Sequence, residues 1–155
     1  KPDLGGYPCR GLRTPHFLYI RNSRPDRGPA GTPDFENTNY PNQWFADCDG
    51  GPTKTYICLN RDKDEAHRRS YELCFAKRPA VELYDLKTDP HQLNNVAGDP
   101  EYADQVALLE TRLDRRLKEL DDPRSTDPGY AEFDVHPYLG GGGGKVPNEV
   151  IEDQN

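Results

Sequence analysis

The sequence predicts an α+β fold, in which a small antiparallel sheet of about four strands carries one long amphipathic helix on one face. Two observations predict it. Residues 81–86 alternate so that both faces of an extended segment carry apolar side chains. Residues 100–120 carry leucines at helical spacing. Packing the helix across the sheet would bury both apolar surfaces, and long loops would connect the remaining pieces.

The segment at 81–86 has the pattern of a strand inside a covered sheet. Its apolar residues divide between the two faces: Val81 and Leu83 on one, Tyr84 and Leu86 on the other. Asp89 and Pro90 then end the strand. Pro90 lacks a backbone donor and disfavours helical dihedrals at the residue before it. We expect the Asp89 carboxylate to accept hydrogen bonds from backbone amides further along the turn.

The segment at 100–120 has the signals of a capped helix. Asp99 stands at the N-cap position, Pro100 at the first helical position, and Glu101 in the first turn, where the helix dipole favours an anion. Pro123 bounds the far end. The apolar stripe consists of Val106, Leu109, Leu113, Leu117 and Leu120.

The remaining elements are predicted from shorter patterns. Two strands come from the first 22 residues, because Thr14 and Pro15 interrupt an otherwise extended stretch. A further strand is predicted at 55–59, which reads TYICL. Residues 62–75 are predicted to be helical, with Tyr71, Leu73 and Phe75 at the buried end. Residues 22–55 form a long polar loop of the kind that often carries function or contacts a partner.

The composition indicates a part of a larger body. Hydrophobic residues make up 33% of the 155 residues, with 14 glycines and 15 prolines. Little apolar surface is therefore available to offset the conformational entropy that the chain loses on folding. Disorder is the alternative, but nine Tyr, five Phe and one Trp exceed what disordered chains usually carry. The chain does not begin with Met, so a leader peptide would not be visible in it.

Charge and hydropathy exclude two classes of partner. The net charge of −7 argues against a nucleic-acid surface, and no stretch approaches the roughly 20 apolar residues of a membrane span. Five arginines do gather near the start, and they either face an anionic partner or, as we favour, are solvated. They are Arg10, Arg13, Arg21, Arg24 and Arg27.

The four cysteines are spaced too widely for a zinc ribbon or a redox CxxC pair. Their even number permits two disulfides in an oxidising compartment. Buried free thiols are the alternative, because cysteine is among the most buried residue types. The residues are Cys9, Cys48, Cys58 and Cys74.

Several segments together match the motifs of one protein family, in the order in which that family has them. Residues 78–102 contain ELYDL, then DP, NN and DPEY in the family's order. YPCRGLRT at 7–14 and FLYIRN at 17–22 are similar to its opening strands, DGGPTK at 49–54 to its "SPTK" segment, and FDVHPY at 133–138 to a tail motif. With these segments the chain resembles the C-terminal subdomain of type I sulfatases, closest to bacterial heparan N-sulfatase (sulfamidase)-like sulfatases. The resemblance covers roughly residues 5–139.

The resemblance implies a sulfatase C-terminal subdomain over 1–124, followed by a polar, glycine-rich tail over 125–155. The parent enzyme would hydrolyse sulfate esters or sulfamates of sulfated glycans in the periplasm or outside the cell. Its formylglycine nucleophile and its calcium would lie in an N-terminal catalytic domain, which is the implied partner. This sequence lacks the C/S-x-P-S-R nucleophile motif, and Cys9 lacks the proline that the motif needs. We therefore expect the chain to be inactive alone, with no catalytic residue and no metal ligand.

Four residues are candidates for substrate contact. Arg10 and Lys54 lie in segments that resemble family motifs, and both can present positive charge to a sulfated glycan. His16 and Trp44 are weaker candidates, since an aromatic loop residue can stack on sugar but usually packs internally. A structural ion pair is the alternative for Arg10 and Lys54.

Two further functions remain open from the sequence: a self-standing glycan-binding module and a purely structural docking module. The docking interpretation predicts an exposed apolar face for the catalytic domain. We expect that face near Phe17, Tyr19, Trp44 and Phe45.

Overall fold

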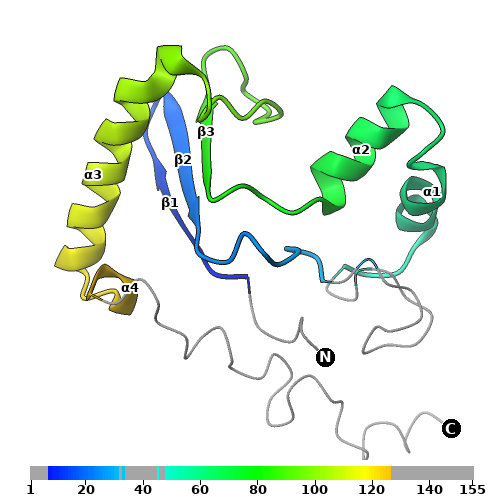
Figure 1. Ribbon diagram of the computed structural model, residues 1–155, viewed down its shortest axis with the longest axis horizontal. Helices are drawn as coiled ribbons and strands as arrows, with labels where there is room; N and C mark the ends of the chain where they lie inside the picture. The colour runs from blue at the N-terminus through cyan, green and yellow to red at the C-terminus, as the bar shows by residue number, and fades with distance from the viewer. Residues whose placement is uncertain (1–6, 32, 34–44, 46–47, 127–155) are drawn as a thin grey trace, which may run out of the picture. The chain divides into compact units, whose positions relative to one another are not determined.

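The computed structural model describes residues 7–31, 33, 45 and 48–126 (Figure 1). The chain divides into two compact units. One includes Asp26–Lys77, and the other combines Pro8–Pro25 with the chain from Arg78 to Ala131. The predicted subdomain over 1–124 therefore contains parts of both units, and almost all of the predicted tail lies outside the described residues.

The unit that contains Arg78 holds a three-stranded antiparallel sheet in the order β1-β2-β3. Leu12, Tyr19 and Leu83 stand opposite one another across the three strands. The elements are β1 (Cys9–Arg13), β2 (Phe17–Asn22), β3 (Val81–Asp85), the 3-10 turn η1 (Pro100–Tyr102), α3 (Ala103–Glu119) and α4 (Pro123–Thr126). The α+β prediction is confirmed, with three strands among the described residues in place of about four.

The core of this unit lies between the sheet and α3, which runs along one face of the sheet in Figure 1. The buried residues of the core are mostly leucines, and burying one leucine side chain stabilises the fold by about 2 kcal/mol. Leu120 is the exception to the predicted stripe: the helix ends at Glu119, and this leucine is 60% exposed. The buried cluster consists of Tyr19, Leu83, Leu109, Leu113 and Leu117.

Both predicted aspartate turns are confirmed. The Asp99 carboxylate accepts a hydrogen bond from the Glu101 amide at 2.9 Å, and the first turn after it is 3-10 before α3 begins. The Asp89 carboxylate accepts from the Asn94 amide at 2.8 Å. These local bonds satisfy amides that have no partner inside a helix or strand.

The free edge of β3 is closed by a side chain where a fourth strand would otherwise pair. The Asn95 side-chain oxygen accepts from the Leu83 amide at 2.8 Å, and its side-chain nitrogen donates to the Val81 carbonyl at 3.2 Å. The Val96 amide donates to the Leu83 carbonyl at 2.9 Å. Because an unpaired edge invites association with other strands, this arrangement protects the outer edge of β3.

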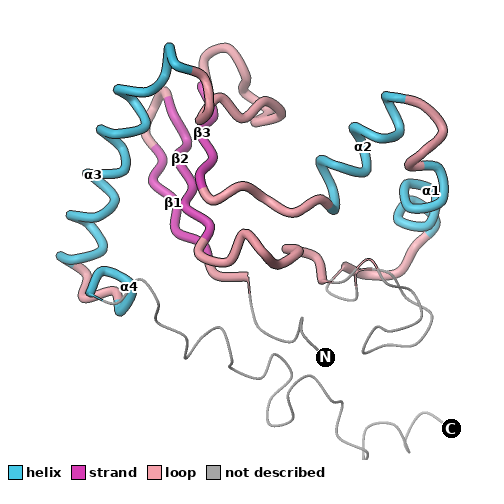
Figure 2. Tube along the Cα trace, viewed as in Figure 1, coloured by secondary structure: helices cyan, strands magenta, loops and turns pink. Residues whose placement is uncertain are grey.

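The other unit contains two helices, α1 (Pro52–Asn60) and α2 (Glu65–Phe75), shown in cyan in Figure 2. The predicted helix at 62–75 is confirmed, and Phe75 is buried at its end. The predicted strand at 55–59 is wrong, because these residues lie within α1. A short apolar run fits a strand or a helix equally well, and Pro52 at the first helical position supports the helix.

We expected an exposed apolar face near Phe17, Tyr19, Trp44 and Phe45. This expectation is wrong for the three of these residues that the structure describes. Tyr19 is fully buried, and Phe17 packs against the same core with its ring edge toward Tyr102. Phe45 is buried and stacks on Phe75 with ring centroids 4.5 Å apart. Trp44 lies outside the described residues. The exposed large apolar side chains are Tyr56, Leu59, Leu93, Leu108 and Leu120.

All four cysteines are free thiols. Cys58 is buried on α1, and burial raises the pKa of its thiol. Cys9 and Cys74 are exposed and Cys48 is half-buried. The free-thiol alternative thus holds in this structure, although only one of the four is buried.

Candidate functional site

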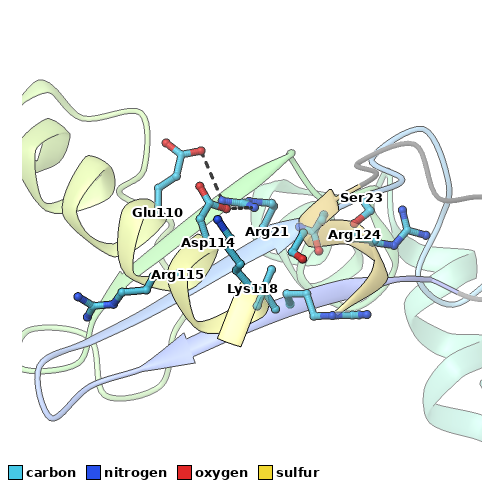
Figure 3. Close-up of a pocket in the computed structure, with 11 residues that line it drawn as sticks. Arg21, Ser23, Glu110, Asp114, Arg115, Lys118 and Arg124 are labelled. Carbon is cyan, nitrogen blue, oxygen red and sulfur yellow. Dashed lines mark hydrogen bonds and ion pairs between the residues drawn. The ribbon is translucent and has the colours of Figure 1, made fainter. Parts of the chain in front are cut away.

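A pocket of about 730 Å³ opens in the sheet-containing unit beside α3, α4 and the paired ends of β1 and β2 (Figure 3). We call it the arginine groove. Its lining contains five cationic side chains and two carboxylates. The cationic residues are Arg10, Arg21, Arg115, Lys118 and Arg124, the carboxylates are Glu110 and Asp114, and the rest are Asn22, Ser23, Leu117 and Ser125.

Arg21 links the sheet to α3 at one side of the groove. It shares a face of β2 with Tyr19, so its side chain meets the helix next to the core. Its guanidinium lies 2.7 Å from the Asp114 carboxylate and 3.6 Å from that of Glu110. Burial acts to lower the pKa of Arg21, but hydrogen bonds led by that with Asp114 outweigh it and raise the pKa. The group therefore stays cationic.

The end of α3 turns sharply to form the far side of the groove. The Asp122 amide donates to the Leu117 carbonyl at 2.9 Å and the Asp121 amide to the Lys118 carbonyl at 3.2 Å. This is the Schellman pattern, which requires a left-handed residue after the helix. Asp121 takes that conformation with φ 53°. The turn sets the direction of α4 and the position of Asp122.

Asp122 then joins this turn to β1. Its carboxylate lies 2.6 Å from Arg10 Nε and also accepts from the Arg124 amide at 3.0 Å. Burial by itself would raise the pKa of Asp122. The hydrogen bonds from Arg10 and from the Arg124 amide outweigh burial, and the pKa is lowered.

The other cations of the lining are Arg115, Lys118 and Arg124, of which Arg124 is buried. In Figure 3, Arg115 and Arg124 point to opposite sides of the pocket, and Arg21 lies between them. Arg115 has only a loose ion pair with Glu119, at 3.9 Å. Lys118 belongs to none of the ion pairs found among residues 7–31, 33, 45 and 48–126. The groove therefore offers positive charge that is only partly neutralised.

The four sequence-predicted contact residues do not lie together. Arg10 lines the groove. Lys54 is in the other unit, 8% exposed, where its ammonium donates to the carbonyl oxygens of Phe45 at 3.1 Å and Cys48 at 2.5 Å. His16 is exposed in the turn between β1 and β2, and Trp44 lies outside the described residues.

Sequence reasoning missed most of the groove. Arg21 and Arg10 were noticed as members of an arginine cluster, but Lys118 and Arg124 were not. One signal was available: Glu110, Asp114 and Lys118 follow one another at intervals of four residues and so lie on one helix face. That pattern indicates a charged stripe beside the leucines, although it does not show what faces it.

A second cluster in the other unit has the order of a proton relay. The Asp64 carboxylate lies 2.7 Å from His67 Nδ1, and Nε2 of that ring lies 3.0 Å from the Tyr56 hydroxyl. However, Asp64 also caps α2 by accepting from the His67 amide at 2.9 Å. That backbone bond, followed by the one to the imidazole, lowers the pKa of Asp64. We read the cluster as a helix cap.

A buried carboxylate on the sheet also has an adequate structural explanation. Glu82 accepts hydrogen bonds from the Asn22 side chain at 2.7 Å and from the Tyr84 hydroxyl at 2.5 Å. Burial, followed by Glu82, raises the pKa of Tyr84. The bond from Asn22 joins β2 to β3, and the two bonds together give Glu82 the donors that a buried carboxylate requires.

Two kinds of feature are absent from the part of the chain that the structure describes. No group of three or more His, Cys, Asp or Glu side chains in that part of the chain is arranged to hold a metal ion. None of the helices in the same residues combines the length and apolar composition needed to cross a membrane.

Comparison with known proteins gives one informative match. No family model matches the chain. It is similar to an ulvan-active sulfatase of Formosa agariphila, with 28% identity over 113 residues. The match covers 73% of this chain but only 17% of the relative, so the chain spans about a sixth of that protein. This similarity supports a relation to the sulfatases.

Proposed function

We propose that this chain is the C-terminal, non-catalytic part of a sulfatase that acts on sulfated glycans. In this role it completes the fold of the enzyme and contributes one wall of the substrate cleft. The observation that carries the proposal is the unequal coverage of the match: most of this chain aligns with a sulfatase of which it spans 17%. The rest of such an enzyme has ample length to hold the reaction centre.

The absence of a nucleophile motif supports the non-catalytic role. Sulfatase chemistry needs a formylglycine made within C/S-x-P-S-R and a calcium ion that neutralises sulfate oxygens. The sequence contains no such motif. The nucleophile and the calcium would therefore belong to a catalytic domain outside this sequence. We place the chain at the C-terminal end because its motifs follow the order of that subdomain, and nearest to heparan N-sulfatase-like enzymes because the ELYDL segment resembles theirs most.

A glycan-binding role is the second candidate, and the arginine groove favours it. A cationic groove can bind a sulfated chain without cutting it. This role is compatible with the first if the groove forms part of the cleft of the whole enzyme. A purely structural docking role would leave the groove without a ligand.

The purified chain gives a direct test of the non-catalytic role. We expect no turnover of an aryl sulfate or of N-sulfated glucosamine, with calcium present, above the rate of a heat-denatured sample. Steady turnover that survives repurification would show that the chain carries its own reaction centre. The proposal would then be wrong.

A further inference from the structure

We propose that the arginine groove binds a sulfate group of a sulfated saccharide, with Arg21, Lys118 and Arg124 as the main cationic contacts. The choice of a sulfated saccharide as the ligand rests on the proposed function. The groove itself is lined by side chains that the structure describes.

Charge is concentrated in the groove against the trend of the chain. The whole protein has a net charge of −7, whereas the groove lining has five cations and two carboxylates. A concave surface with an excess of one sign of charge raises the local concentration of oppositely charged ligands.

The ion pairs of Arg21 are weak enough for another anion to compete with them. Arg21 is paired with Asp114 and Glu110, but the side chains of these two carboxylates are 59% and 50% exposed. Ion pairs with such exposure contribute only about 0–1 kcal/mol. A sulfate oxygen can therefore share the Arg21 guanidinium, whose planar donors match an oxyanion.

The opposite wall of the groove is held in place by the fold. Arg10 and Asp122 join β1 to the turn after α3, and the Schellman bonds fix that turn. The Asp122 carboxylate also accepts from the Arg124 amide. The Ser23 and Ser125 side chains add neutral polar groups to the lining. A site with fixed walls loses little conformational entropy on binding.

The experiment titrates the 155-residue chain with a sulfated oligosaccharide at low ionic strength and follows amide shifts by NMR. We expect Lys118→Glu to weaken binding about fivefold to tenfold, since a charge reversal near the ligand changes the free energy by about 1 kcal/mol or more. Glu110→Gln should strengthen binding about twofold to threefold, because it removes a carboxylate that competes for Arg21.

Lys87→Glu is the matched control. It makes the same change in net charge at an exposed position in the turn after β3, which lies at the opposite end of the strands from Arg21. We expect it to change the dissociation constant by less than about twofold, because Lys87 does not line the groove and the interaction of two charges weakens as the distance between them grows.

Two ligand arms identify the group that is bound. The chemically desulfated oligosaccharide, which keeps its carboxylates, should bind at least about fivefold more weakly. Sodium sulfate should compete better than sodium chloride at equal ionic strength. Equal binding of the desulfated chain, equal weakening by Lys118→Glu and Lys87→Glu, or no binding by the wild-type chain would each overturn the inference. The turnover assay measures a different property, so saccharide binding by the groove and the non-catalytic role of the chain are tested independently.

Discussion

The two units of this protein use buried or half-buried cations in different ways. In the sheet-containing unit, Arg10 and Arg21 reach carboxylates that are 112 and 93 residues away along the chain. In the other unit, the buried Lys54 ammonium bonds to two carbonyl oxygens of the nearby loop. The first arrangement joins distant elements and leaves a groove beside them. The second holds a loop against α1 and offers no charge to a ligand.

This difference predicts which substitutions destabilise only their neighbourhood and which destabilise a whole unit. In the sheet-containing unit the core is shared between β2, β3 and α3, so a defect there affects all three elements. Among the residues that the structure describes, the cluster in the other unit is smaller and consists of Phe45, Cys58 and Phe75. A defect there should be confined to α1, α2 and the loop that they hold.

Leu109→Ala should have the largest effect on stability. The side chain is completely buried between α3 and the sheet, and such a truncation costs about 2–5 kcal/mol from lost burial and the cavity left behind. Hydrogen exchange should accelerate in β2, β3 and α3, while α1 and α2 keep their protection. Leu108→Ala, one residue earlier and exposed, is the control and should change stability by less than about 0.5 kcal/mol. Equal acceleration in both units would show that they do not unfold independently.

Lys54→Met should have a smaller and more local effect. The change keeps most of the apolar stem and removes the ammonium, so the carbonyls of Phe45 and Cys48 lose their donor. The expected cost is about 1–2 kcal/mol, because two charge-assisted hydrogen bonds are lost but the desolvation of a buried charge is also relieved. Exchange should accelerate in α1 and α2, with saccharide binding unchanged. Unchanged stability together with loss of saccharide binding would instead support the substrate-contact interpretation of Lys54.

Asp122→Asn should give the smallest of the three effects, and it should depend on pH. Asparagine can still accept from the Arg124 amide, so the change isolates the charge that faces Arg10. Because the folded pKa of Asp122 is lowered, the carboxylate contributes stability above the unfolded pKa of about 3.9 and loses it as pH falls through the folded pKa. We expect the variant to be about 1 kcal/mol less stable at pH 7. Urea denaturation at several pH values should show the difference shrinking below about pH 4; a constant difference would contradict the assignment.

The parts that could be predicted from sequence are those set by neighbours in the chain. Asp99, Pro100 and the leucine spacing act within a few residues of one another, so the capped helix was predicted correctly. The TYICL segment was assigned to a strand because five residues, four of them apolar, are too few to distinguish the strand period from the helix period. Pro52, which lies outside that window, favours the helix.

The groove could not be predicted because its contacts are not local. Nothing in the sequence indicates that Arg10 would meet Asp122, since that contact depends on the register of β1 with β2 and on the left-handed turn at Asp121. The edge of β3 was likewise missed. An asparagine in a loop does not reveal that its amide will replace a strand, as the Asn95 side chain does here.

A segment exchange tests the central claim most directly. The 113-residue region of the Formosa agariphila sulfatase that aligns with this chain would be replaced by the corresponding residues of this protein, and a variant with that region deleted would be made alongside. We predict that the deletion abolishes sulfatase activity and that the exchanged enzyme recovers a measurable part of it, because the proposed function assigns this chain the same part of the fold. A deletion variant that retains full activity, or an exchanged enzyme that is soluble and folded yet as inactive as the deletion, would contradict the account.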